Sequence, residues 1–267
     1  MEEMNEQFPA NDENIEELSH TDKMVGVFTE PNKTFSAMSK LAIKNSDWLI
    51  PIIVLIIVAV AANLAMMSNP IIKATIMEKS IKQIEKNLQE AVEAGRLSEE
   101  QADEQLEKIR DNMERSMGSP ILSFVGPFLY TFITFFIIAG VFFLFAKFAL
   151  GGDGTYSTSM VAYGLPHYIL IVQTIVLVIL ALSMDKPFRD LSLATLLDYD
   201  RTSIVGFLLG RLDVFAIWFY SVVSIAYARL FKSESTGKYF VMIFGLWIGF
   251  GFLMFVGANY LPFLRGF

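Results

Sequence analysis

The sequence predicts an all-α membrane protein: a bundle of about five transmembrane helices with a helical hairpin outside the membrane. Of the 267 residues, 54% are hydrophobic and only 18% are charged, whereas soluble domains average about 45–50% apolar and about 25% charged residues. The charges are concentrated in a few stretches and leave long apolar segments between them. Several of these segments reach the roughly 20 residues that a helix needs to cross a hydrocarbon core of about 30 Å.

The N-terminal segment is acidic and poor in large apolar residues. Eight Asp and Glu residues precede the first basic residue, Lys23, so most of the net charge of −7 belongs to this segment. Residues 1–23 are therefore predicted to be a disordered acidic tail. They lack the features of a cleavable signal peptide, so the first span is expected to direct membrane insertion. The remaining chain has no basic excess, which argues against nucleic-acid binding.

Residues 31–44 follow the tail and show helical spacing. Pro31 suits the first turn of a helix, and Phe35, Met38 and Leu41 recur on one face with lysines between them. Such a basic amphipathic segment is typical of a helix lying in the membrane interface. A cap packed on the helix bundle is an equally good interpretation.

The predicted spans are residues 48–72, 121–146, 160–184, 204–230 and 239–260. Trp48 marks the edge of the first span, where an amphipathic indole is favoured. Pro166 lies inside the third span and predicts a kink, because proline removes a backbone hydrogen bond. Gly245 and Gly249 in the fifth span have the spacing that lets membrane helices approach closely.

Residues 73–118 differ from the spans because they are rich in charge. Two amphipathic stripes flank the turn at Ala94, Gly95 and Arg96, and Ser98 with Gln101 forms a capping box. This pattern predicts an antiparallel helical hairpin whose arms continue the first and second spans out of the membrane.

Charge does not fix the orientation of the bundle. With the N-terminus inside, the inner segments carry eight Lys and Arg residues and the outer segments four, which favours that orientation. Counting the eight basic residues of the hairpin with the outer side reverses the balance to eight against twelve.

Five polar residues inside the predicted spans form the candidate intramembrane site: Asp213, Arg211, His167, Gln173 and Asn63. Ionisable groups in spans are energetically costly and usually face protein or water. One interpretation is a proton- or ion-responsive path. The other is structural, with Arg211 reaching toward headgroups and the other side chains hydrogen-bonded to neighbouring helices. Arg211 and Asp213 are two residues apart, so a direct pair on one helix is not expected.

Catalytic and cofactor motifs are absent from the sequence. Residues 151–154 read Gly-Gly-Asp-Gly but lack the Lys-Ser/Thr of a phosphate loop, which indicates a turn. There are no cysteines and only two histidines, so thiolate or histidine metal sites are not expected. The chain is therefore predicted to be neither an enzyme nor a cofactor-binding protein.

Several short motifs resemble those of the YIP-domain family of membrane proteins. They are the segments 27–31 (VFTEP), 162–166 (AYGLP) and 212–218 (LDVFAIW, which ends at Trp218), followed by a glycine-rich last helix. The resemblance covers about residues 25–263. It implies a five-helix bundle with a cytoplasmic N-terminus. Eukaryotic members act in vesicle traffic with Rab-type GTPases, and some bacterial members accompany ABC-type efflux transporters. The long hairpin departs from the short loop of eukaryotic members.

We therefore expect a non-enzymatic scaffold or accessory protein of the bacterial inner (cytoplasmic) membrane, in contact with lipids and a protein partner such as an ABC transporter. The alternative is a small transporter or channel component that uses the polar groups of the third and fourth spans. A membrane enzyme acting on lipid is a third interpretation, for which the sequence offers no convergent polar groups. The sequence does not determine the oligomeric state.

Overall fold

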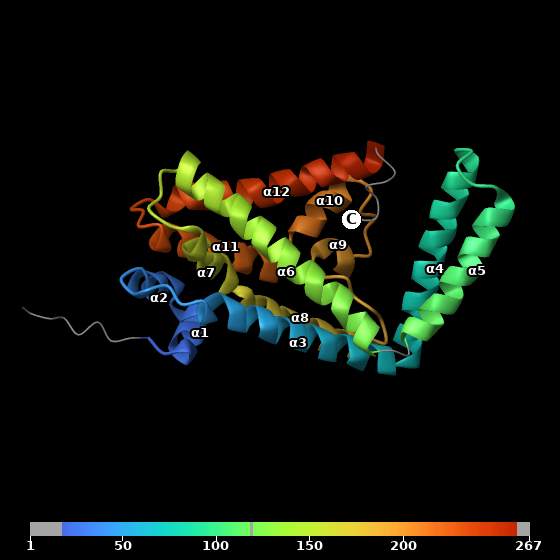
Figure 1. Cartoon of the computed structure of the whole chain (residues 1–267), viewed down its shortest axis with the longest axis horizontal. Helices are drawn as coiled ribbons and strands as arrows, with labels where there is room; N and C mark the ends of the chain where they lie inside the picture. Colours follow the sequence, from blue (N-terminus) through green and yellow to red (C-terminus); the bar gives the residue numbers. More distant parts are fainter. Residues whose placement is uncertain (1–17, 118–119, 261–267) are drawn as a thin grey trace, which may run out of the picture.

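The computed structural model describes residues 18–117 and 120–260, and all regular elements in these ranges are helical (Figure 1). In chain order they are α1 His20–Thr29, α2 Pro31–Met38, α3 Ser46–Ser68, α4 Pro70–Glu93, α5 Glu99–Met117, α6 Pro120–Leu144, the π-helical turn η1 Phe145–Ala149, α7 Tyr156–Gly164, α8 His167–Met184, α9 Leu193–Leu196, α10 Ile204–Arg211, α11 Val214–Leu230 and α12 Thr236–Tyr260. The predicted all-α class is confirmed.

Four helical stretches within the described residues are long and apolar enough to cross a membrane: Ser46–Ser68, Phe128–Ala149, Tyr156–Met184 and Thr236–Gly257. A fifth crossing is formed if α10 and α11 act together, although they are bent by 61° relative to each other. The chain is therefore an integral membrane protein with four or five candidate spans among its described residues. The predicted fourth span, 204–230, is not one continuous helix, because Asp213 interrupts it and begins α11 as its N-cap.

The first span ends four residues earlier than predicted. Asn69 adopts an extended conformation and accepts hydrogen bonds from the backbone N–H groups of Ile71 and Ile72 at 2.9 and 3.2 Å. Pro70 then occupies the first position of α4. A residue before proline is driven away from the α region, so the Asn-Pro pair ends one helix and begins another. The amide of Asn69 also donates to Asp185 at the end of α8, at 2.6 Å.

The hairpin consists of α4 and α5, and it turns sharply away from α3 rather than continuing it (Figure 1). The predicted capping box is confirmed: the Gln101 N–H donates to the Ser98 hydroxyl at 3.2 Å, and the Ser98 N–H donates to the Gln101 side chain at 3.0 Å. Gly95 at the turn has a φ of +68°, the left-handed region that favours glycine. The first arm is therefore not a direct continuation of α3, because the chain breaks at Asn69 and α4 begins in a new direction.

The segment before the first span forms two short helices that pack on the bundle. Phe35 and Met38 of α2 are buried, and Phe28 of α1 meets Trp218 of α11 edge to face, with 5.7 Å between ring centroids. The predicted helix 31–44 therefore ends at Met38, and the cap interpretation describes it better than an interfacial helix. Residues 1–17 of the predicted tail lie outside the described residues, and α1 already begins at His20.

The buried core is a layer of aromatic and aliphatic side chains between α3, α6, α7, α8, α11 and α12. Its largest buried members include Tyr227, Phe219 and Ile52. The break between α7 and α8 falls at Leu165 and Pro166, where a proline kink was predicted. Pro166 itself has helical angles, so the two helices still form one span of 29 residues.

The Gly-Gly-Asp-Gly segment is a tight connection against the start of α12. Gly151 has a φ of +66°. A Cβ on Gly152 would lie 2.5 Å from the hydroxyl of Tyr239, and one on Gly154 would lie 2.6 Å from the ring of Phe231. These glycines are needed because the backbone passes directly over two aromatic rings. The interpretation of this segment as a turn is confirmed.

Candidate functional site

The fourth span contains the most unusual arrangement of polar groups, at the break between α10 and α11. Asp213 is 4% exposed. One carboxylate oxygen accepts from the N–H groups of Phe215 and Ala216 at 2.9 and 3.2 Å, which caps α11. The other accepts from the side-chain amide of Gln173 and from the N–H of Leu191, both at 3.1 Å.

Asp213 therefore links three parts of the fold. It holds the start of α11, the middle of α8 through Gln173, and the loop after α8 through Leu191. Four N–H donors occupy the two carboxylate oxygens, so the buried side chain of Asp213 has hydrogen-bond partners on both oxygens. This arrangement is suited to holding the broken fourth span against α8 and the loop after it, and we call the four hydrogen bonds of Asp213 the clamp.

The clamp lies deep in the bundle. Gln173 is 11 residues from the end of α8 at Met184, which corresponds to about 16 Å at 1.5 Å per residue. This is close to the middle of a hydrocarbon core of about 30 Å. The loop after α8 must therefore dip into the bundle to reach Asp213, which agrees with the hydrogen bond from the N–H of Leu193 to the carbonyl of Leu212 at 3.1 Å.

A second polar network secures this loop. The guanidinium of Arg201 donates to both carboxylate oxygens of Asp190 at 2.7 and 2.8 Å, and to the hydroxyls of Ser192 and Thr195 at 2.9 and 2.6 Å. Burial raises the pKa of Asp190, but the hydrogen bonds from Thr195, Ser192 and Arg201 together lower it by more. The pKa of Asp190 therefore lies below its ordinary value. These residues were not singled out in the sequence, where they read as an ordinary polar loop.

Arg211 lies apart from Asp213, as expected from their spacing. Its guanidinium sits over the rings of Phe207 and Trp247, at 4.9 and 5.4 Å from the ring centroids. Within the described part of the chain it has neither a hydrogen-bond acceptor nor a carboxylate at ion-pair distance. A Cβ on Gly251 would overlap its Nη2 atom, so the guanidinium packs directly against the backbone of α12.

The other predicted site residues do not join this group. His167 is buried in an aromatic cluster of Phe135, Tyr163 and Phe219, and its Nδ1 lies 2.9 Å from the carbonyl oxygen of Tyr163. Asn63 is on an exposed face of α3. The structure thus brings Asp213 and Gln173 together, and it leaves Arg211, His167 and Asn63 in separate surroundings.

The predicted close-packing glycines also lie elsewhere. Gly245 and Gly249 are exposed on α12, and a Cβ on either would meet no atom within 4 Å among the described residues. The close approach predicted for them is not found within the described chain. It occurs at Gly251, where the partner is the Arg211 side chain and not another helix backbone.

A buried ion pair near α1 was missed from the sequence. Lys23 of α1 donates to both carboxylate oxygens of Asp47 at 3.0 and 2.8 Å, and the two side chains are 5% and 3% exposed. His20 places Nδ1 3.5 Å from Asp47 and Nε2 2.7 Å from the hydroxyl of Tyr168. The pair joins positions 24 residues apart, so no periodicity in the sequence could reveal it.

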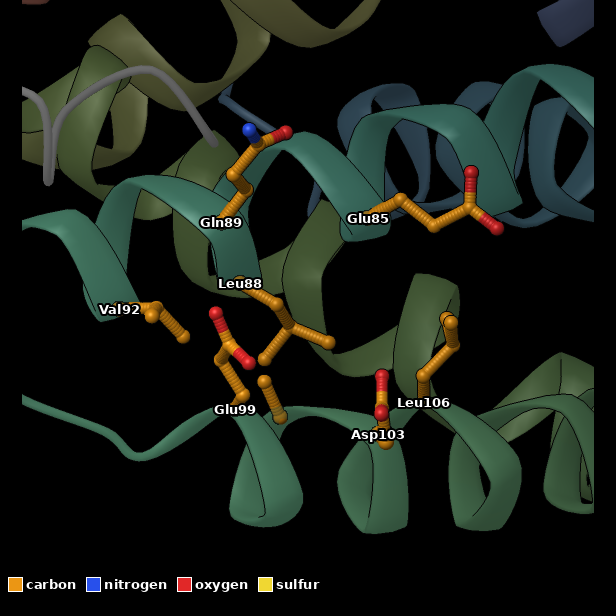
Figure 2. Close-up of a pocket in the computed structure, with 8 residues that line it drawn as sticks. Glu85, Leu88, Gln89, Val92, Glu99, Asp103 and Leu106 are labelled. Carbon is orange, nitrogen blue, oxygen red and sulfur yellow. The ribbon is translucent and has the colours of Figure 1, made fainter.

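The hairpin carries an open groove between its helices, with a volume of about 340 Å³. Figure 2 shows Leu88 and Val92 of α4 directed toward α5, and Glu99 and Asp103 of α5 directed toward α4. No group of three or more potential metal ligands occurs among the described residues. The groove is therefore best described as an amphipathic seam with an acidic edge.

Comparison with known proteins gives one informative result. No curated protein and no solved structure gives a significant match to this chain. The family model of the Yip1 domain matches residues 25–258. This range includes α2 to α11 completely, the second half of α1 and most of α12. The chain therefore belongs to the Yip1 domain family of integral membrane proteins.

Proposed function

We propose that the protein is a non-enzymatic scaffold or accessory protein of the membrane, and that the α4–α5 hairpin contacts a protein partner. One observation carries this proposal: the hairpin projects from the bundle as a separate arm (Figure 1). Members of the Yip1 family are generally not enzymes, which agrees with the first part.

The arm has internal contacts of its own. Arg110 of α5 donates to Glu85 of α4 at 2.6 Å, and the apolar side chains of Leu88 and Leu106 line the seam between the helices. A two-helix arm of this kind can present its outer faces to a partner without first folding on it. An unstructured loop would have to be ordered on binding, at a cost in affinity.

The charge of the outer half of the arm limits the kind of partner. Residues 85–107 contain eight Asp and Glu residues but only Lys86 and Arg96 as bases. Opposite charges across an interface accelerate association and exclude wrong partners. We therefore expect a partner with a basic surface close to the membrane. An ABC-type efflux transporter is the partner class that the family resemblance favours.

The test is deletion of residues 77–115, with the two ends joined by a short Gly/Ser linker. Crosslinked co-purification from native membranes compares this variant with the full chain. Loss of a specific partner, with membrane insertion and thermal unfolding of the bundle unchanged, would support the proposal. Co-purification of the same partner without the hairpin would refute it.

A second variant tests the charge argument with the arm intact. Glu99→Lys, Glu100→Lys and Asp103→Lys together reverse the acidic edge of α5. We expect weaker partner recovery that is rescued in part at higher protein concentration. The matched control replaces Lys79 and Lys82, nearer the base of α4, with glutamine and should leave recovery unchanged.

A small transporter or channel component is the second candidate, and the broken fourth span favours it. Discontinuous helices near the bilayer midplane often form the binding sites of transporters. Flux of protons or ions into liposomes containing the purified protein tests this function. Flux that is lost in Asp213→Asn would favour transport over the scaffold role.

A further inference from the structure

Arg211 is a cation that has no anionic partner among the described residues, and apolar side chains surround it. A guanidinium has five N–H donors, and none of them has an acceptor among the residues that the structure describes. The nitrogens of Arg211 are not sealed inside the protein, because the only fully buried side-chain N or O atoms without a hydrogen-bond partner in the described chain are His20 Nδ1 and the Tyr239 hydroxyl. The donors of Arg211 therefore reach the molecular surface.

The surface around these donors is apolar. Leu208 and Leu212 near the end of α10 are 56% and 48% exposed, and Phe250 and Phe252 of α12 are 67% and 43% exposed. Side chains of this kind on a membrane protein face acyl chains. A ligand for this place must therefore combine an anionic group for the arginine with an apolar body for its surroundings.

The depth of Arg211 makes an anion energetically important. It contacts Gly251, which lies nine residues before the end of α12 at Tyr260, and nine residues correspond to about 13 Å of helix. An arginine below the membrane surface is energetically costly unless it reaches headgroups or the bilayer thins around it. A phosphate drawn toward the arginine would remove this cost.

The geometry of the site is fixed before any ligand binds. The rings of Phe207 and Trp247 hold the guanidinium plane by cation–π contacts, and Gly251 leaves space for it against α12. A planar guanidinium held in this way presents paired N–H groups that match two oxygens of a phosphate.

We propose that Arg211, supported by Phe207, Trp247 and Gly251, binds the phosphate of an anionic phospholipid at the seam between α10 and α12. The guanidinium pairs with the phosphate, and the acyl chains cover the apolar surface of both helices. The lipid comes from the leaflet on the hairpin side, where α8 and α12 end and where Asn69 contacts Asp185. The bound lipid supplies the anionic partner that Arg211 lacks among the described residues.

The experiment is native mass spectrometry of the delipidated full chain in detergent, titrated with phosphatidylglycerol. Two probes separate the parts of the ligand: diacylglycerol has the chains without the phosphate, and inorganic phosphate has the anion without the chains. We expect phosphatidylglycerol to bind and both single-feature probes to bind at least about tenfold more weakly. Inorganic phosphate that competes as well as the lipid would overturn the lipid assignment.

Two matched pairs of variants locate the site. Arg211→Gln should weaken phosphatidylglycerol binding about tenfold or more, whereas Arg189→Gln, an exposed arginine on the same side, should not. Gly251→Ala keeps the charge but displaces the guanidinium, and should weaken binding, whereas Gly249→Ala on the same helix should not. Equal binding by all four variants would refute the proposal. The Gly251 pair keeps the test decisive if Arg211→Gln fails to fold.

Discussion

The buried ion pair between Lys23 and Asp47 makes the sharpest prediction about stability. Replacing Lys23 with methionine keeps most of its volume but removes the charge that neutralises Asp47. The Asp47 side chain is 3% exposed, and among the described residues His20, at 3.5 Å, would be its remaining basic neighbour. Removing one partner of a buried pair typically costs about 3–5 kcal/mol, because the other charge is left uncompensated.

We expect the loss to appear as release of α1 from the bundle, since Lys23 is the charge that connects this helix to α3. The lower end of the range, about 3 kcal/mol, corresponds to an increase of roughly 150-fold in the population with α1 undocked. Hydrogen exchange of the α1 amides, followed by mass spectrometry in detergent or nanodiscs, measures this population directly.

Two further variants complete the design. Lys33→Met removes a comparable ion pair with Glu30, but these side chains are 82% and 60% exposed, so exchange should change by less than about threefold. The double variant Lys23→Met with Asp47→Leu removes both charges and should recover most of the protection. If Lys23→Met exchanges like the wild type, or if the double variant is worse than either single variant, the ion pair does not hold α1.

Three other perturbations test the rest of the fold. Gln173→Leu removes one of the four donors to Asp213 and should lower the stability by about 1–2 kcal/mol, measured by thermal unfolding in detergent. Gly154→Ala forces a Cβ toward the ring of Phe231 and should destabilise by about 1–3 kcal/mol in the same assay. Asp190 has a folded pKa below its ordinary value of 3.8, so its contribution to stability is present above that pH and is lost as the pH falls below it. Asp190→Asn should therefore make the acid limb of the stability profile shallower.

Each of these three has a control or a contradicting outcome. Gly237→Ala introduces a Cβ that meets nothing within 4 Å, so it should leave the unfolding temperature nearly unchanged. Unchanged stability in Gln173→Leu would mean that its hydrogen bond to Asp213 is not needed for the clamp. If the stability of Asp190→Asn falls as steeply with decreasing pH as that of the wild type, the group responsible for the acid loss is not Asp190.

The sequence correctly predicted those features that depend only on residues close together in the chain. The lengths of the apolar segments, the capping box at Ser98 and Gln101 and the break near Pro166 were all predictable, because each depends on neighbouring residues. The Asn69-Pro70 break was visible in the sequence by the same logic, but the predicted first span continued through it, because Ile71 and Ile72 beyond it are apolar.

From the sequence, the candidate site was predictable only as a set of polar residues that are energetically unfavourable in a membrane span. The sequence identified Asp213, Gln173 and Arg211 because polar groups in apolar spans are rare. It did not indicate that Asp213 bonds to Gln173 across 40 positions, or that Arg211 turns toward α12. The same holds for His167, whose neighbours Phe135 and Phe219 come from two other helices.

By itself, the sequence determined that this chain is a multi-spanning helical membrane protein with a charged hairpin, since hydrophobic length and helical periodicity are local properties. Only the tertiary structure decided which charges are paired. Lys23, assigned to a disordered tail from its composition, is a buried partner of Asp47, while Arg211 packs on aromatic rings and has no anionic partner among the described residues. The physical reason is that the cost of a charge depends on the groups around it, and those groups come from helices distant in the sequence.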